Sequence, residues 1–261
     1  MQKPRFRIYG LLALMLFLFS GCLKIGEYYA GLHMQPDTGE AFEPGLNVFG
    51  VVKCGPSLDS TNHFFEVHKL LNLANSTDTI FQIIDAEIQL TRCTPSQQIE
   101  EYFPQPSPDS LYSDSQIEVS PGDQWSFRCQ YDSFSVSASC IVPQLPVLHS
   151  EIQRSANSLS LILQADSTAF LYQVYVFENN QFAQIQHVPT PGKQVKIEIP
   201  ISWQPQAGSG LVYIFAYDQN VRIYQTTSNT FFKPNTYRPA FSTVDGGYGV
   251  FGAISSALVS Y

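Results

Sequence analysis

The sequence predicts an all-β protein with two β-sandwich domains, preceded by an export segment and a tether. Short runs alternate apolar and polar residues, as in KQVKIEI at 193–199, and this period of two is typical of a half-buried strand. Turn residues such as Asn179-Asn180 separate the runs. Behind the export segment the chain keeps enough residues for one or two packed domains.

Residues 1–21 are predicted to be a lipoprotein signal peptide. Lys3, Arg5 and Arg7 precede an apolar run at 8–19, which is the layout of a secretory signal. A transmembrane helix needs roughly 20 apolar residues, so a permanent span is disfavoured. Phe19-Ser20-Gly21-Cys22 resembles a lipobox, with Phe where Leu is usual. We expect acyl chains such as palmitate on Cys22 to hold the protein at a membrane; an ordinary signal peptide is the alternative.

Residues 22–45 are predicted to be the lipidated N-terminus and a flexible tether. They contain Gly, Pro and acidic residues without a sustained period. The folded part is expected to begin near Leu46.

The first sandwich is assigned to residues 46–145. Trp125, Phe127, Cys129 and Tyr131 fall on one face of a strand. The segment at 63–75 is compatible with either a helix or a strand. A proline-rich stretch at 95–110 is too polar for a central strand and is expected to be a surface loop.

The second sandwich is assigned to residues 146–261, because Pro143 and Pro146 make a stiff boundary. FLYQVYVFE at 170–178 has apolar residues on both faces and is expected to form a hairpin with the run after Asn180. LVYIFAY at 211–217 and VRIYQTT at 221–227 are expected to form another. Closely spaced short strands favour immunoglobulin-like or fibronectin-like sandwiches over α/β units.

Four cysteines remain after Cys22, and their spacing fits no metal motif. They are Cys54, Cys93, Cys129 and Cys140. An exported protein can oxidise them, so up to two disulfides are possible, with 54–93 and 129–140 as the favoured pairs. Free buried thiols are the alternative.

The charge of the chain disfavours nucleic acid as a partner. The full chain has a formal net charge of −8. Without residues 1–21 it keeps 11 basic and 22 acidic side chains, a net charge of −11. Such a surface repels phosphates, and no basic cluster offsets it.

Gly247, Gly249 and Gly252 match the dinucleotide pattern GxGxxG, but the context is wrong. That motif needs a following helix and an acidic residue about 20 positions later, whereas only nine residues follow Gly252. We interpret 245–252, including Asp245 and Gly246, as a structural turn leading into a last strand.

The sequence predicts neither a metal site, nor a cofactor, nor an enzyme. The histidines are scattered and none belongs to a zinc spacing; they are His33, His63, His68, His149 and His187. GxSxG and SxxK motifs are absent from the sequence. An envelope hydrolase with a triad built from distant residues is the remaining enzymatic hypothesis.

Several segments together resemble the Bacteroidota outer-membrane lipoproteins catalogued as domain of unknown function 4249. The most specific is FSTVDGGYGVFGAISSA, in which Thr243 stands where that family more often has Asn. LNVFGVV, AEIQL, VSPGDQWSFRCQY and YQTTSNTFF also fit. The resemblance covers about 46–258 and implies two β-sandwiches without established catalytic residues.

The resemblance also implies a role, because such proteins are commonly encoded beside TonB-dependent transporters. We therefore expect an accessory lipoprotein of an outer-membrane barrel that helps capture a substrate or partner. Lipidation suggests the cell surface, with the periplasmic face as the alternative. A stand-alone module for a glycan, peptide or host ligand is the rival function. Loops at 95–110 and near Asp245 are the candidate contact regions.

Overall fold

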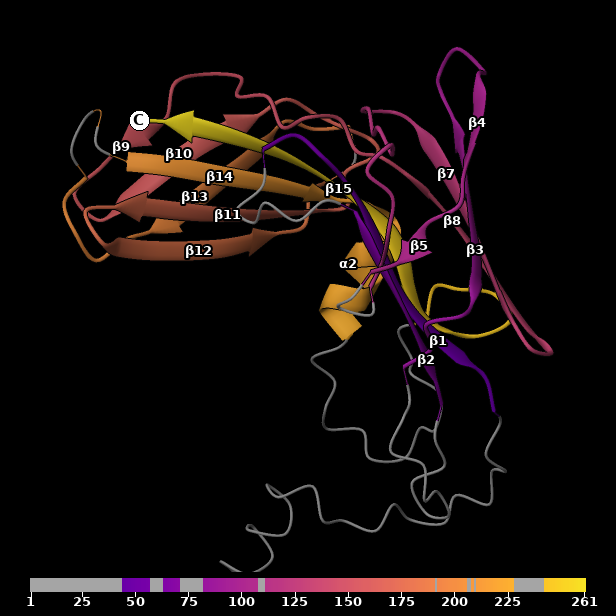
Figure 1. The fold of residues 1–261 in the computed structure, drawn as a ribbon. Coiled ribbons are helices and arrows are strands. Elements are labelled where there is room, and N and C mark those ends of the chain that lie inside the picture. The colour runs from indigo at the N-terminus through magenta and orange to yellow at the C-terminus, as the bar shows by residue number, and fades with distance from the viewer. Residues whose placement is uncertain are drawn as a thin grey trace, which may run out of the picture. The chain divides into compact units, whose positions relative to one another are not determined.

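We describe the protein from a computed structural model. The described residues are 44–56, 63–70, 82–107, 111–190, 192–205, 208, 210–227 and 242–261. The signal peptide, Cys22 and nearly all of the tether lie outside them. Within these ranges the strands form three sheets (Figure 1), and the all-β prediction is confirmed.

The C-terminal sandwich packs a three-stranded sheet against part of a larger one. The smaller sheet contains β9 (Gln153–Arg154), β10 (Ser158–Leu163) and β13 (Val195–Pro200). The facing strands are β11 (Leu171–Glu178), β12 (Gln181–His187), β14 (Gly210–Tyr217) and β15 (Tyr248–Ser260), in the order β12-β11-β14-β15. Alternate residues of both sheets enter one core, as Leu161 and Ile197 do from one side and Val174 and Ile214 from the other.

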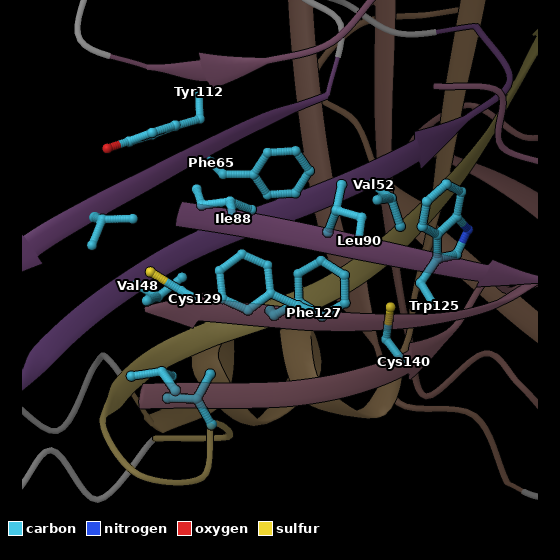
Figure 2. Close-up of a cluster of buried hydrophobic side chains, with 14 of the residues drawn as sticks. Val48, Val52, Phe65, Ile88, Leu90, Tyr112, Trp125, Phe127, Cys129 and Cys140 are labelled. Carbon is cyan, nitrogen blue, oxygen red and sulfur yellow. The ribbon is translucent and has the colours of Figure 1, made fainter. Parts of the chain in front are cut away.

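The N-terminal sandwich places a four-stranded sheet against the rest of the larger sheet. The four strands are β3 (Glu87–Cys93), β4 (Ile99–Tyr102), β7 (Gln124–Tyr131) and β8 (Phe134–Ile141). Opposite them are β1 (Leu46–Cys54), β2 (Phe64–Lys69), β5 (Gln105–Pro106), β6 (Tyr112–Ser113) and the first half of β15. Figure 2 shows this core, in which the Phe65 and Phe127 ring centroids are 6.1 Å apart. Trp125 and Phe127 are both buried, as the predicted strand face requires.

Strand β15 belongs to both sandwiches. Its first half pairs parallel with β1, from Asn47 opposite Tyr248 to Cys54 opposite Ser255. Its second half pairs antiparallel with β14 as far as Ser260 opposite Leu211. A single 13-residue strand therefore completes one sandwich and continues into the other.

The chain passes from one core to the other near Pro143 and Pro146, and its C-terminal segment returns to the first core. Val142 packs in the N-terminal core and Leu148 against the C-terminal core, so the chain changes core at Pro143–Pro146. However, Val244 and Phe251 also pack in the N-terminal core. The segment 146–261 is thus not one domain, because the first sandwich takes its last strand from the C-terminus.

Two local predictions meet different outcomes. The hairpin of β11 and β12 is confirmed, with Asn179 and Asn180 at φ of 46° and 63°, as a tight turn requires. The predicted second hairpin is wrong, because 219–227 forms helix α2 (Gln219–Thr227). Asp218 accepts a hydrogen bond from the Val221 amide at 2.8 Å and caps this helix. The ambiguous segment at 63–75 contains strand β2.

Candidate functional site

The most distinctive exposed surface is one face of β12, β11, β14 and β15. We call it the aromatic face. It faces away from the C-terminal core, and its members are Gln173, Tyr175, Phe177, Phe182, Gln184, Gln186, Leu211, Tyr213, Phe215, Leu258 and Ser260. Phe182, Leu211 and Leu258 are 51%, 41% and 42% exposed. The face contains no charged side chain.

Strand register places these residues together. Val174 and Val176 point into the core, so their neighbours Tyr175 and Phe177 must point outward. The register sets Tyr175 between Gln184 of β12 and Tyr213 of β14. The apolar residues on both faces of FLYQVYVFE were the sequence signal for this surface, but sequence reasoning did not identify it as a site.

The aromatic rings hold one another in place. Tyr175 contacts Phe182 at 5.9 Å between centroids and meets Phe215 edge-on at 5.7 Å. Phe177 contacts Phe182 at 5.2 Å and Tyr213 edge-on at 5.8 Å. Offset and edge-to-face pairs are favourable for aromatic side chains. The face is therefore a preorganised platform.

Helix α2 marks one end of the aromatic face. Its Val221 packs with Leu171 and Tyr217 in a small separate cluster, beside Phe215. Burial raises the pKa of Tyr217, and its hydroxyl donates to Gln173 Oε1 at 2.7 Å. This bond fixes the Gln173 amide where the exposed part of the face begins.

The loop predicted at 95–110 lines a second, smaller site. A hollow of about 280 Å³ lies between residues 103–106 and the outer side of β3 and β7. Phe103 is 55% exposed at this hollow, and Arg128 and Glu87 lie across from it. Residues 99–102 and 105–106 are short strands, so only part of the predicted loop is irregular.

The glycine-rich segment forms a turn that leads into β15. Gly246 and Gly249 have φ of 77° and 102°, conformations that favour glycine. Asp245 pairs its backbone with Ser137 of β8, which ties the turn to the N-terminal sandwich. A Cβ on Gly247 would lie 2.6 Å from Val136.

Gly252 allows helix α2 to approach β15. A Cβ on Gly252 would lie 2.5 Å from Val221 Cγ2 and 2.8 Å from Asp218 Oδ1. Asn220 Nδ2 donates to the Phe251 and Ser139 carbonyl oxygens, both at 2.8 Å. The three glycines of GxGxxG thus serve a turn, a strand and a helix contact.

The predicted disulfides are not formed. All four cysteines are free thiols: Cys54, Cys93, Cys129 and Cys140. Cys140 lies opposite Trp125, four residues along β7 from Cys129, an offset of about 13 Å. A disulfide needs Cα atoms within about 7 Å, and Figure 2 shows the two sulfurs at separate places. Cys54 and Cys93 belong to different sheets.

A buried ion pair joins strand β3 to the turn before β7. Arg92 Nε donates to Asp123 Oδ2 at 2.8 Å, and Arg92 Nη1 donates to Glu100 at 3.0 Å. The Ser120 amide also donates to Asp123 Oδ2. Asp123 is fully buried, and its Oδ1 has no hydrogen-bond partner among the described residues. This cluster supports the N-terminal sandwich.

The described histidines do not gather at a metal site. No group of three potential ligands occurs in the described part of the chain. His63 Nδ1 accepts a hydrogen bond from the Lys53 amide at 3.0 Å, and burial lowers the His63 pKa. His33 lies outside the described residues. Within the same ranges, no helix has the length and apolarity to cross a membrane.

By its own strand order the chain is a β-sandwich protein that exposes an aromatic sheet face. No family model matches it, and no curated protein is significantly similar. A two-domain fibronectin type-III segment of chicken tenascin is 11% identical over 85% of this chain and 97% of its own, with a TM-score of 0.25.

Two further solved structures are similar at the same low level. A tetra-tandem repeat from the extending region of a large adhesion protein is 9% identical over 84% of this chain and 50% of its own, with a TM-score of 0.22. The chicken interferon gamma receptor alpha chain is 10% identical over 68% and 89%, with a TM-score of 0.20. The fold assignment therefore rests on the sheets described above.

Proposed function

We propose that this chain is a non-catalytic binding protein, tethered to the outer membrane by lipid on Cys22, that works beside a TonB-dependent transporter. The aromatic face is its capture surface. One observation carries the proposal: an uncharged surface of five aromatic rings and two leucines is partly open to solvent.

An exposed apolar surface of this kind is energetically unfavourable in water unless a ligand or partner covers it. Contiguous apolar patches are uncommon on soluble proteins and mark interaction sites. Aromatic side chains are enriched where proteins make contacts, because they offer large area with few rotatable bonds. Here the rings already restrain one another, so little conformational entropy remains to be lost on binding.

Buried polar groups of the C-terminal sandwich serve the fold instead. Asp218 caps α2. Glu178 accepts hydrogen bonds from Trp203 Nε1 at 2.7 Å and from the Tyr261 hydroxyl at 2.9 Å, which joins the last residue to β11. These contacts support a scaffold whose function is to present a surface.

The resemblance to the lipoprotein family supports the transporter partner. Its most specific segment ends in β15, which holds the two sandwiches together. Crosslinking in intact cells, followed by affinity purification in detergent, is expected to recover a TonB-dependent barrel with the full chain. A Cys22→Ala variant is the control and should lose the barrel. Recovery of the lipoprotein alone would contradict this partner.

A stand-alone binding module is the second candidate function. In this candidate the aromatic face, built from four paired strands, holds the ligand without a barrel. Undiminished ligand binding by the purified protein, together with failure to recover a barrel, would select this candidate.

A further inference from the structure

We infer that the ligand of the aromatic face is an uncharged polysaccharide. This inference rests on the proposed function, since it names the ligand of the proposed capture surface. Pyranose rings present a face of C–H groups with hydroxyl groups around the edge. A binding surface for them needs aromatic rings to stack against and neutral hydrogen-bonding groups beside the rings.

The rings form a continuous surface across neighbouring strands. Opposite positions in the register are Phe182, Phe177 and Leu211 in one row, and Gln184, Tyr175, Tyr213 and Leu258 in the next. Adjacent strands lie about 4.8 Å apart, so the four-strand row spans about 14 Å. That length accommodates several consecutive sugar rings, which favours a chain over a single sugar.

Amide side chains lie beside the rings. Gln184 and Gln186 are exposed on β12, and Gln173 follows them on β11. Each glutamine amide offers both donors and acceptors, as sugar hydroxyl groups require. Because Tyr217 donates to Gln173 Oε1, that amide is held in a fixed orientation before the ligand arrives.

The absence of charged side chains from the aromatic face favours an uncharged ligand. The aromatic face has no charged member, whereas the chain has a net charge of −8. An acidic polysaccharide would be repelled by the whole protein and would find no cation on the face. A neutral polysaccharide is not repelled by the protein and needs no cation on the aromatic face.

The small exposed apolar area of the aromatic face disfavours a second copy of the protein as its occupant. Three apolar members are 41–51% exposed and the other four are partly buried. The seven together offer roughly 400 Å², about half of the ~800 Å² per partner in a standard interface. A polysaccharide needs only this narrow strip.

The experiment is a depletion assay with the purified full chain in detergent. Insoluble starch, cellulose and mannan are the neutral probes, and calcium-crosslinked polygalacturonate is the acidic one. Bound protein is quantified on gels. We expect retention on at least one neutral probe and none on the acidic probe. Phe182→Ala and Tyr175→Ala should each weaken retention about tenfold.

Ile84→Ala is the matched control, because Ile84 is 56% exposed and lies outside both the aromatic face and the hollow beside residues 103–106. Its retention should equal that of the unaltered chain, and circular dichroism should show all variants folded. Light scattering should give the same mass for Phe182→Ala and the unaltered chain. A dimer lost in Phe182→Ala would instead identify a second copy as the occupant.

Three results would overturn the inference: no retention on any neutral probe, unchanged retention in both aromatic-face variants, or loss of retention in Ile84→Ala. The proposed function is tested separately. Barrel recovery without neutral-glycan retention would reject the ligand class and keep the transporter role. Neutral-glycan retention without barrel recovery would reject the transporter role and keep the ligand class.

Discussion

The Asp218 carboxylate accepts a hydrogen bond from the Val221 amide at 2.8 Å while it is almost fully buried. Burial raises the pKa of Asp218 from 3.8 to about 7, and hydrogen bonds from backbone amides partly oppose the rise. The same carboxylate therefore begins helix α2 and carries a proton more readily than an exposed aspartate.

This pKa makes Asp218 a source of pH-dependent stability. Between about pH 4 and 7 the folded protein holds a proton here that the unfolded chain has released. The contribution of Asp218 to the free energy of unfolding thus falls as pH rises, by up to about 1.4 kcal/mol per unit, and is level above pH 7. Asn is also a good helix cap, so urea unfolding of Asp218→Asn from pH 4 to 7 should lack this slope. An identical slope in both proteins would refute the assignment.

Removal of Asp123 should destabilise the N-terminal sandwich. Asp123→Ala leaves the Arg92 guanidinium, whose side chain is 10% exposed, without its buried partner. Breaking such a pair costs about 3–5 kcal/mol, measurable by urea unfolding. Glu100→Ala is the control, because Glu100 is 44% exposed and such pairs contribute about 1 kcal/mol or less. Equal effects of the two substitutions would contradict the buried role.

Gly249→Ala should destabilise the folded protein more than Gly192→Ala. Both glycines have positive φ, but a Cβ on Gly249 would collide with the Val48 carbonyl of β1, whereas a Cβ on Gly192 would meet nothing within 4 Å. We expect a cost of about 1 kcal/mol at Gly192 and at least about 3 kcal/mol at Gly249, as thermal unfolding would show. Similar melting temperatures would argue against the close approach of β1 and β15.

Thiol labelling should detect four free cysteines beside Cys22. Burial raises the pKa of Cys129 to about 12, and burial also raises the Cys140 pKa. Because the thiolate is the reactive form, these two should react with Ellman's reagent only after unfolding. Cys54 and Cys93, which are half-buried, should react earlier. A count of fewer than four thiols in the unreduced, denatured chain would show that a disulfide is present.

Lipidation is tested by metabolic labelling with a palmitate analogue. The unaltered chain should incorporate the label, and Cys22→Ala should abolish incorporation because no other residue is predicted to carry the lipid. Cys54→Ala is the matched control and should label normally. Persistent labelling of Cys22→Ala would remove the basis for the membrane tether.

Local pattern was sufficient for most strands but not for α2 or β15. Period-two runs such as 193–199 predicted β13, because one face of each strand is buried. VRIYQTT contains β-branched residues and was predicted as a strand, yet the Asp218 cap and the contact at Gly252 favour a helix. The aromatic face was missed because it depends on pairing of the β11–β12 hairpin with β14 and β15, which lie farther along the chain.

The pairing of β1 with β15 also determines when the first sandwich can be completed. A chain is synthesised from its N-terminus, so Asn47 exists long before its partner Tyr248. Until β15 has been made, the N-terminal core lacks Phe251 and β1 lacks its parallel neighbour. The first sandwich is therefore completed only after strands β10 to β14 of the second have been synthesised.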